Sequence, residues 1–359
     1  MEGKEPPLNG HSWQSYLLAS NLDQSFYSLI NKYLIDFEIL WQEMFAKSSY
    51  QLCQLDGGSR LRPTIAFLGH LINNQKDSSS IKHILKLGVS IEMIHKASLL
   101  IDDIVDGDQL RNGKETFHVV NGIDKALTMA TFLIGKAYSG FADTFYHLDK
   151  NHNTDKYFIL SADILKDMSE GLMMELEMID FSGNQISTSA EIIRKETSSI
   201  IKNALVLGYL LGSEENLKIT ESLNVIGELC GYMFQVMNDI EPFGDSTKRI
   251  LNKGDSINEF YFNRKNIVVS YITHLLGEEE RLSLFDVKDP KRGSDILIEY
   301  FYELKVWPHF LDEFGEISDL IHKKIQILKN EGVSDEWCSN CESFIEALVN
   351  IAKGKMYLR

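Results

Sequence analysis

The chain has 359 residues, of which 44% are apolar and 25% charged, so it can bury a sizeable core, and disordered and fibrous classes are excluded. Acidic residues outnumber basic ones by 52 to 36, and the net charge of -16 opposes general attraction to nucleic acid or anionic membrane. Four cysteines are too few for a disulfide framework, the start lacks a secretory pattern, and no apolar stretch approaches membrane-spanning length. We expect a cytoplasmic protein with no nucleic-acid partner and no transmembrane segment.

Helical periodicity dominates the chain. No proline lies between Ile65 and Glu241, so long helices can form there without interruption. Apolar residues recur at three- and four-residue spacing, for example in Ile84, Leu87, Ile91, Ile94, in Leu127, Ala130, Ile134, Ala137, and in Ile200, Ala204, Leu207, Leu211. The best strand candidate, residues 266–272, is short. The pattern predicts an all-α fold with about a dozen helices, as one domain over residues 13–359 after a flexible N-terminus at residues 1–12.

The first segment with chemical character is residues 57–63, Gly-Gly-Ser-Arg-Leu-Arg-Pro. Its two glycines allow the backbone to approach an anion closely, and its two arginines supply donors. Pro63 fits the first turn of a following helix, whose N-terminus also attracts phosphate. An ordinary glycine-rich turn before a helix explains the segment equally well.

Asp102, Asp103 and Asp106 form the second segment, at the end of an apolar helical run. On a helix, positions i and i+4 share a face, so these carboxylates can point into one space and hold a hard cation such as Mg²⁺. With 52 acidic residues in 359, about one such spacing is expected by chance, and a solvated acidic helix end is the alternative. The apolar residues 99–101 just before it favour carboxylates entering from a buried wall, where a cation would relieve their repulsion.

Two further segments follow. Arg111 stands five residues after Asp106, in a turn that can bring its guanidinium back over the carboxylates. Residues 234–242, Phe-Gln-Val-Met-Asn-Asp-Ile-Glu-Pro, form a second polar cluster at the end of an apolar helix. Its alternative is a plain helix end stopped by Pro242.

Taken together, these segments resemble the trans-isoprenyl diphosphate synthases, the polyprenyl synthetase family. Residues 57–63 are similar to GGKRLRP, residues 92–106 to ExxHxxSLxxDDxxD, residues 110–118 to LRRGKPTxH, and residues 234–242 to FQxxDDxxD. The resemblance implies an isoprenoid-synthase-type helical bundle around a deep central cavity, as a homodimer. It also implies that two acidic motifs hold an allylic prenyl diphosphate through Mg²⁺ ions, and that a second substrate, isopentenyl diphosphate, attacks the allylic cation.

Residue by residue, the resemblance implies four groups. The metal ligands would be Asp102, Asp103, Asp106, Asn238 and Asp239. The allylic diphosphate would contact Arg111, Lys253, Lys265 and Gln235, and the acceptor diphosphate would contact Gly58, Arg62 and His95. Ala97, Ser98 and Ile94 would line the pocket that sets chain length, and small residues there predict products of about 20 carbons or longer. Met173, Met174 and Met178 are expected to pack in the core.

The sequence departs from the family pattern mainly where cations are expected. Ser59 replaces a lysine and Asn112 an arginine, both of which bind isopentenyl diphosphate in the family. Glu196 stands where the family has another lysine, although Lys195 or Lys202 could substitute for it. Because each charged hydrogen bond contributes roughly 1.5 to 3 kcal/mol, the acceptor site should be weakened.

The second acidic motif also differs, with Asn238 in place of its first aspartate and Pro242 in place of its last. The leading hypothesis is therefore a Mg²⁺-dependent prenyltransferase that condenses an allylic prenyl diphosphate with isopentenyl diphosphate. Prenyl transfer to another acceptor, or cyclase-like ionisation, is one alternative. A non-catalytic or regulatory subunit, related to the active synthases, is another.

Overall fold

The computed structural model describes residues 22–46, 55, 57–72, 78–146, 154–177, 185–212, 214–243 and 266–356. Nearly all of these residues are helical, and the strands among them are the antiparallel pair β1 (Leu110–Arg111) and β2 (Lys114–Glu115). The all-α prediction is confirmed. The expected flexible segment 1–12 lies outside the described residues, and the single domain at 13–359 stays a prediction.

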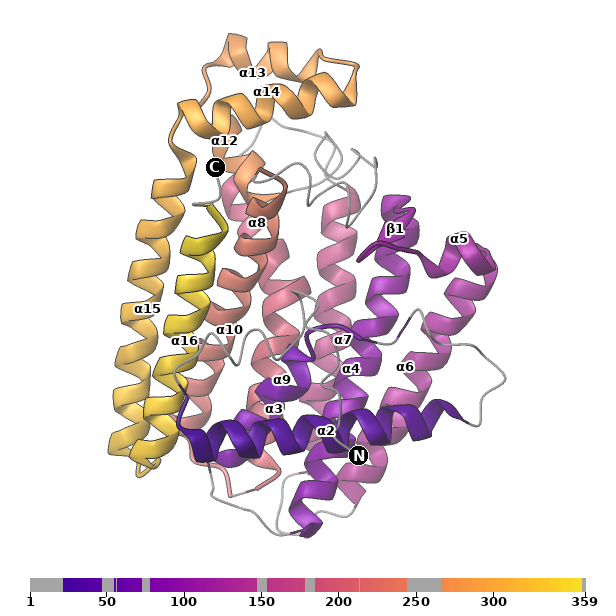
Figure 1. The fold of residues 1–359 in the computed structure, drawn as a ribbon, viewed down its shortest axis with the longest axis vertical. Coiled ribbons are helices and arrows are strands. Elements are labelled where there is room, and N and C mark those ends of the chain that lie inside the picture. The colour runs from indigo at the N-terminus through magenta and orange to yellow at the C-terminus, as the bar shows by residue number, and fades with distance from the viewer. Residues whose placement is uncertain are drawn as a thin grey trace, which may run out of the picture.

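Most of the long helices run side by side along the length of the molecule, while α2, α13 and α14 lie across them (Figure 1). They are α2 (Gln24–Ala46), α3 (Leu61–Leu71), α4 (Ser78–Asp106), α5 (Phe117–Asn121), α6 (Ile123–Tyr146), α7 (Thr154–Glu177), α8 (Gln185–Ile193), α9 (Ser199–Leu210), α10 (Leu217–Ile240), α12 (Ile267–Leu275), α13 (Glu278–Phe285), α14 (Pro290–Glu303), α15 (Val306–Asn330) and α16 (Asp335–Met356). A π-helix, η1 (Arg194–Ser198), precedes α9, and a 3₁₀ turn, η2 (Glu241–Phe243), follows α10.

Helix α4 runs through the bundle and packs against α3 and α6 (Figure 1). Its periodic apolar positions, from Ile84 to Ile94, are all buried, as their spacing predicts. The same holds for Ile200, Ala204 and Leu207 on α9. On α6 the spacing also falls on a helix, where Ala130 and Ala137 are buried while Leu127 is 46% exposed.

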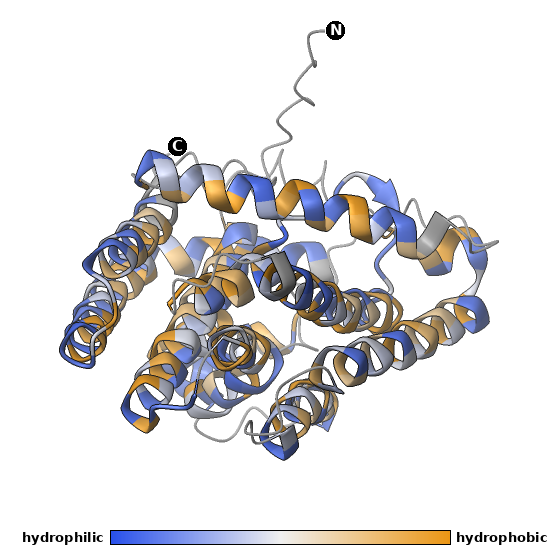
Figure 2. Ribbon diagram, turned by 90° about the horizontal axis from the view of Figure 1, so that it is seen from below, coloured by the Kyte–Doolittle hydropathy of each residue, from blue (hydrophilic) through white to orange (hydrophobic). Residues whose placement is uncertain are grey.

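Helix α2 lies across one side of the bundle, nearly perpendicular to the helices that Figure 2 shows end on. Its buried stripe of Ile30, Leu34, Phe37 and Trp41 follows the i, i+3, i+4 rule and packs on the core. Tyr33 stacks on Phe67 of α3, with 4.1 Å between ring centroids. This packing places α2 next to the segment that precedes α3.

The strand candidate at residues 266–272 is helical, as part of α12. Asn266 caps this helix, because its side-chain oxygen accepts hydrogen bonds from the backbone N–H of Val268 at 2.9 Å and of Val269 at 3.3 Å. The run of β-branched residues that indicates a strand is thus overridden by a cap and by burial on the bundle.

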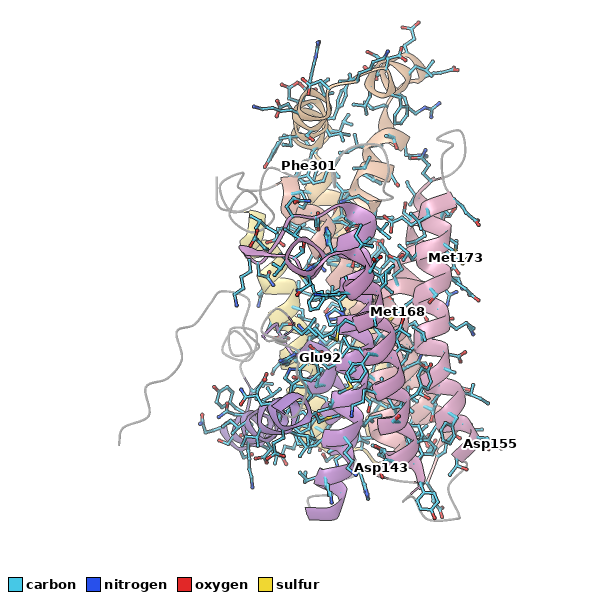
Figure 3. All side chains as sticks on the ribbon, turned by 90° about the vertical axis from the view of Figure 1, so that its right-hand side faces the viewer. Glu92, Asp143, Asp155, Met168, Met173 and Phe301 are labelled. Carbon is cyan, nitrogen blue, oxygen red and sulfur yellow. The ribbon has the colours of Figure 1, made fainter. Side chains whose placement is uncertain are left out.

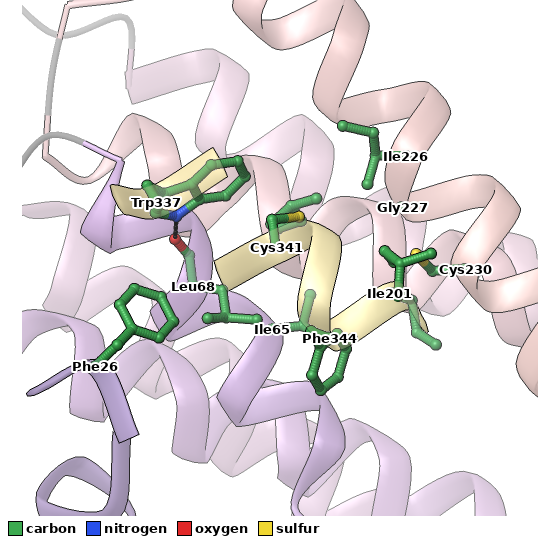
Figure 4. Close-up of a pocket in the computed structure, with 12 residues that line it drawn as sticks. Phe26, Ile65, Leu68, Ile201, Ile226, Gly227, Cys230, Trp337, Cys341 and Phe344 are labelled. Carbon is green, nitrogen blue, oxygen red and sulfur yellow. Dashed lines mark hydrogen bonds between the residues drawn. The ribbon is translucent and has the colours of Figure 1, made fainter. Parts of the chain in front are cut away.

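A small apolar cavity of about 30 Å³ lies where α3, α9, α10 and α16 meet (Figure 4). The indole N–H of Trp337 donates to the carbonyl oxygen of Leu68 at 2.8 Å beside it. None of the predicted site residues lines this cavity, and the deep central cavity stays a prediction.

Within the described part of the chain, no helix combines the length and apolarity needed to cross a membrane. The cytoplasmic location stays a prediction as well.

Candidate active site

The two acidic motifs end at the same end of the bundle. Helix α4 finishes with Asp102, Asp103 and Asp106, and helix α10 finishes with Asn238 and Asp239. Both helices reach the end of the molecule that β1 and α12 mark in Figure 1. Asp103 and Asp239 are buried, Asp102 and Asp106 are partly buried, and Asn238 is exposed.

A tight hairpin brings Arg111 back onto the first motif. Asn112 and Gly113, at φ of 53° and 74°, form the two-residue turn between β1 and β2, which is the turn that an Asn-Gly pair favours. The Arg111 Nε donates to the Asp103 Oδ1 at 2.6 Å. In the sequence, Asn112 is interpreted only as the replacement of an arginine. The geometry of the turn gives a second reason for an asparagine at this position.

The second motif is held by a chain of hydrogen bonds. Thr197 donates to the Gln235 Oε1 at 2.8 Å, and the Gln235 Nε2 donates to the Asp239 Oδ1 at 2.8 Å. The other oxygen of Asp239 accepts the backbone N–H of Ile267 at 3.0 Å, at the start of α12. Gln235, expected to contact the allylic diphosphate, is used here to orient the carboxylate of Asp239.

Glu196 lies where the two motifs face each other. Burial, together with the nearby charges of Glu175, Asp102 and Asp239, raises the pKa of Glu196 to about 9. These three carboxylates come from α7, α4 and α10 respectively. Carboxylates of both acidic motifs therefore act on the carboxyl group of Glu196. At neutral pH Glu196 is therefore protonated. We call Asp102, Asp103, Asp239 and Glu196 the acidic cluster.

Two glycines allow η1 to carry Glu196 between α7 and α10. A Cβ on Gly171 of α7 would lie 2.5 Å from the Glu196 Cγ, and one on Gly231 of α10 would lie 2.4 Å from the Ser198 Cα. Only glycine permits these approaches, and single π turns of this kind are frequent at functional sites. The neighbouring Lys195 pairs instead with Glu170, with 2.7 Å between Nζ and Oε2.

The donor set of the acidic cluster fits Mg²⁺ in its chemistry, because it consists of carboxylates and repels itself without a cation. Among the described residues, no three His, Cys, Asp or Glu side chains lie close enough together to hold a metal ion on their own. Mg²⁺ commonly keeps several waters and takes phosphate oxygens as ligands, with only one or two carboxylates. The arrangement therefore fits ions that bridge the motifs and a diphosphate.

The glycine-rich loop before α3 holds one of its two arginines inside the protein. Arg60 is 1% exposed and lies at φ 48°, in the left-handed region. Its guanidinium pairs with Glu38 at 2.7 Å and with Glu92 at 2.8 Å. It also lies over the ring of Trp41, 4.8 Å from the centroid. Arg60 is thus fully used in joining the loop to α2 and α4.

Arg62, by contrast, contacts a neutral partner. Its Nη1 lies 3.0 Å from the Nε2 of His95, and burial and nearby cations hold the pKa of His95 well below its usual value. His95 therefore accepts this hydrogen bond as a neutral ring. The Arg62 Nε is buried and has no hydrogen-bond partner among the described residues. Burial lowers the pKa of Arg62 to about 10, so it stays charged at neutral pH.

Lys96 lies beside Arg62 and His95. It is not among the site residues predicted from the sequence. It is 7% exposed, and its ammonium donates to the carbonyl oxygen of Gly57 at 2.9 Å. The only signal for it in the sequence is a lysine inside an otherwise apolar helical run, directly after His95. We call Arg62, His95 and Lys96 the basic cluster, and it adjoins Gly58 as predicted for an acceptor site.

The residues expected to set chain length precede the first motif on α4. Ile94 and Ala97 are buried, and Ser98 is partly exposed and donates to the carbonyl oxygen of His95 at 2.9 Å.

The core prediction is wrong for Met173, which is 58% exposed on the outer side of α7 (Figure 3). Met168, one turn earlier, packs against the core instead. Lys253, Lys265 and Met178 lie outside the described residues.

Comparison with known proteins gives one consistent result. The family model described as "Polyprenyl synthetase" matches residues 42–259, more than half of the chain. A short chain isoprenyl diphosphate synthase of Methanocaldococcus jannaschii is 25% identical over 69% of this chain and 72% of its own. A geranylfarnesyl diphosphate synthase of Aeropyrum pernix is 25% identical over 76% of this chain and 85% of its own.

Solved structures show the same fold. A polyprenyl synthase from Caulobacter crescentus, in complex with calcium and isoprenyl diphosphate, has a TM-score of 0.75 at 20% identity, covering 96% of this chain and 99% of its own. A geranylgeranyl pyrophosphate synthase from Corynebacterium glutamicum, in complex with isoprenyl diphosphate and magnesium, has a TM-score of 0.72 at 17% identity, covering 90% and 97%.

Proposed function

This chain belongs to the polyprenyl synthetase family, a family of prenyltransferases, and we propose that it condenses an allylic prenyl diphosphate with isopentenyl diphosphate in a Mg²⁺-dependent reaction. The observation that carries the proposal is the pairing of two oppositely charged clusters. Asp102 affects the pKa of Glu196 on one side and of Arg62 on the other. A site for a metal-bound diphosphate thus adjoins a site for a second anion.

On the donor side, Asp102, Asp103 and Asp239 would hold the ions. Bound Mg²⁺ would supply positive charge against the leaving diphosphate. The chain itself orients this side: Gln235 fixes the carboxylate of Asp239, and the hairpin holds Arg111 on Asp103. A substrate diphosphate would compete with Asp103 for the forked donors of Arg111. Since Glu196 is neutral at pH 7, it adds no further repulsion to the arriving anion.

On the acceptor side, Arg62 would bind the diphosphate of isopentenyl diphosphate, with His95 holding its guanidinium. The reaction then breaks the allylic C–O bond, and the electron pair leaves with the diphosphate. The double bond of the acceptor forms the new C–C bond, and a proton is released. Oriented binding of two anions close to each other is the main contribution that these residues make.

The length of the product belongs to the same proposal. Ala97 and Ser98 lie one helical turn before the first motif, on the helix that carries it. Their small side chains leave room for a long hydrocarbon tail beside α4. We therefore expect products of about 20 carbons or longer.

A homodimer is part of the proposal as well. Helices α6 and α7 carry several large apolar side chains that are exposed in the single chain: Leu127, Phe132, Phe158, Ile159, Met173 and Leu176. Exposed apolar residues gathered on neighbouring helices are typical of a surface that another chain covers. Light scattering on the purified protein, with Phe158→Glu as the variant expected to separate the subunits, tests this point.

The direct test of function uses the purified chain with labelled farnesyl diphosphate, isopentenyl diphosphate and Mg²⁺. Longer labelled prenyl diphosphates are expected, and none without Mg²⁺. If no elongated product forms although Mg²⁺ and pyrophosphate together stabilise the protein, the acceptor assignment is wrong. If neither product nor stabilisation is seen, the chain does not act as a prenyl donor enzyme, and a regulatory subunit becomes the better reading.

A further inference from the structure

The basic cluster contains a buried cation that the proposed mechanism does not yet use. Lys96 lies on α4, and its ammonium reaches under the glycine loop, where a Cβ on Gly58 would be 3.3 Å away. One of its hydrogens goes to the carbonyl oxygen of Gly57 at 2.9 Å. The carboxylate oxygen Oε1 of Glu92 is 3.9 Å away, too far for a strong hydrogen bond.

Glu92 is already engaged, since its Oε1 accepts from the Arg60 Nη1 at 2.8 Å. Arg60 pairs with two carboxylates, Glu38 and Glu92, whereas Arg62 is attracted by Glu92 and Asp102 over longer distances and Lys96 by Glu92 at 3.9 Å. Among the described residues, Arg62 and Lys96 therefore have no carboxylate within hydrogen-bonding distance. A buried excess of positive charge is costly unless an anion joins it.

We propose that the Lys96 ammonium binds the diphosphate of the acceptor substrate, together with Arg62, and supplies the cation that Ser59 removed from the loop. The inference rests on the proposed function for the identity of the acceptor. It depends on three observations: Lys96 adjoins Gly58, it is one residue from His95, and it keeps hydrogens to donate after the bond to Gly57. In this chain the cation would come from Lys96 on α4 and not from position 59 of the loop.

Binding of isopentenyl diphosphate alone, followed by calorimetry without Mg²⁺ or allylic substrate, tests this inference. Lys96→Met is expected to weaken binding about tenfold or more, since a charged hydrogen bond is lost. Lys96→Arg should retain most of the affinity. The double variant Ser59→Lys with Lys96→Met places the cation back on the loop, and it is expected to recover most of the loss.

The double variant separates binding from a purely structural role of Lys96 in holding the Gly57 carbonyl. If Lys96→Met weakens binding and Ser59→Lys does not restore it, the residue supports the loop and the inference is overturned. Unchanged binding in Lys96→Met, or no binding by the unaltered chain, overturns it too. If the unaltered chain binds isopentenyl diphosphate through Lys96 but forms no elongated product, the proposed function fails while this inference stands.

Discussion

The acidic cluster and the basic cluster follow each other along α4, and they are built in different ways. The acidic cluster gathers side chains from three segments, α4, η1 and α10, which come together only in the folded chain. The basic cluster is local to α4 and the loop before α3. The first is left with surplus negative charge and the second with surplus positive charge.

This difference explains how the chain departs from its family. By the resemblance to the family, Glu196 stands at a lysine position, and its carboxyl group is neutral at pH 7. By the same resemblance, Ser59 stands at a lysine position of the loop, and the ammonium of Lys96 on α4 lies nearby. Local clusters tolerate such a shift because a side chain from the adjacent helix can reach the same space.

The largest expected effect concerns stability and shows which basic residues are free for a ligand. Arg60→Met leaves Glu92 buried without its partner, so we expect a loss of about 3 to 5 kcal/mol in the free energy of unfolding. Arg62→Met should cost far less stability, since Arg62 pairs with neutral His95, yet it should weaken isopentenyl diphosphate binding. Urea unfolding of both variants measures the contrast. Equal losses of stability would show that the two arginines have the same role.

The next effect concerns the acidic cluster. Asp102→Asn keeps the shape of the side chain and removes its charge, so we expect turnover to fall about 10²- to 10³-fold. The stabilisation of the protein by Mg²⁺ with inorganic pyrophosphate should fall as well. Asp155→Asn, at an exposed position on the first turn of α7, is the matched control and should change neither. A fully active Asp102→Asn would remove the first motif from the mechanism.

Much of this architecture follows from the sequence alone. The helices could be predicted because apolar spacing on α4 and α9 is regular and no proline interrupts it. The two acidic motifs could be paired because their order and spacing resemble those of a known family. The Asn112 and Gly113 pair favours the hairpin, and the predicted turn that brings Arg111 back to the carboxylates is present.

Other features depend on contacts that a sequence does not show. A lysine such as Lys96 usually extends to solvent, and only the fold places its ammonium under Gly58. Gln235 orients Asp239 because Thr197 and Asp239 contact both ends of its amide, and its contact with the allylic diphosphate stays a prediction. Met173 is exposed whereas Met168 on the same helix packs against the core, and the residue type alone does not distinguish the two.

Ala97 tests whether the hydrocarbon tail runs between the two clusters and along α4. Ala97→Phe inserts a large ring at a buried position, so we expect shorter products and a cost of about 1 to 3 kcal/mol in stability. Chromatography of the labelled products measures the length. Ala97→Val, a smaller enlargement, is the control for stability and should shorten products less. If Ala97→Phe folds and its product length is unchanged, the tail takes another path.

The smallest expected effect is a pH dependence that belongs to the basic cluster alone. Burial, opposed by Glu92 and assisted by Arg60, Arg111 and Arg62, lowers the pKa of Lys96 to about 8. Since only the ammonium form attracts a diphosphate, the contribution of Lys96 is complete below pH 8 and is lost as the pH rises through this value. Affinity for isopentenyl diphosphate should then fall by at most about tenfold per pH unit.

The Lys96→Arg variant provides the reference for this measurement, because a guanidinium stays charged throughout the range. The ratio of the two dissociation constants, unaltered chain over variant, cancels any ionisation of the diphosphate itself. This ratio is expected to be flat from pH 6 to about 7.5 and to rise above pH 8. A ratio that stays flat to pH 9.5 would contradict the lowered pKa of Lys96.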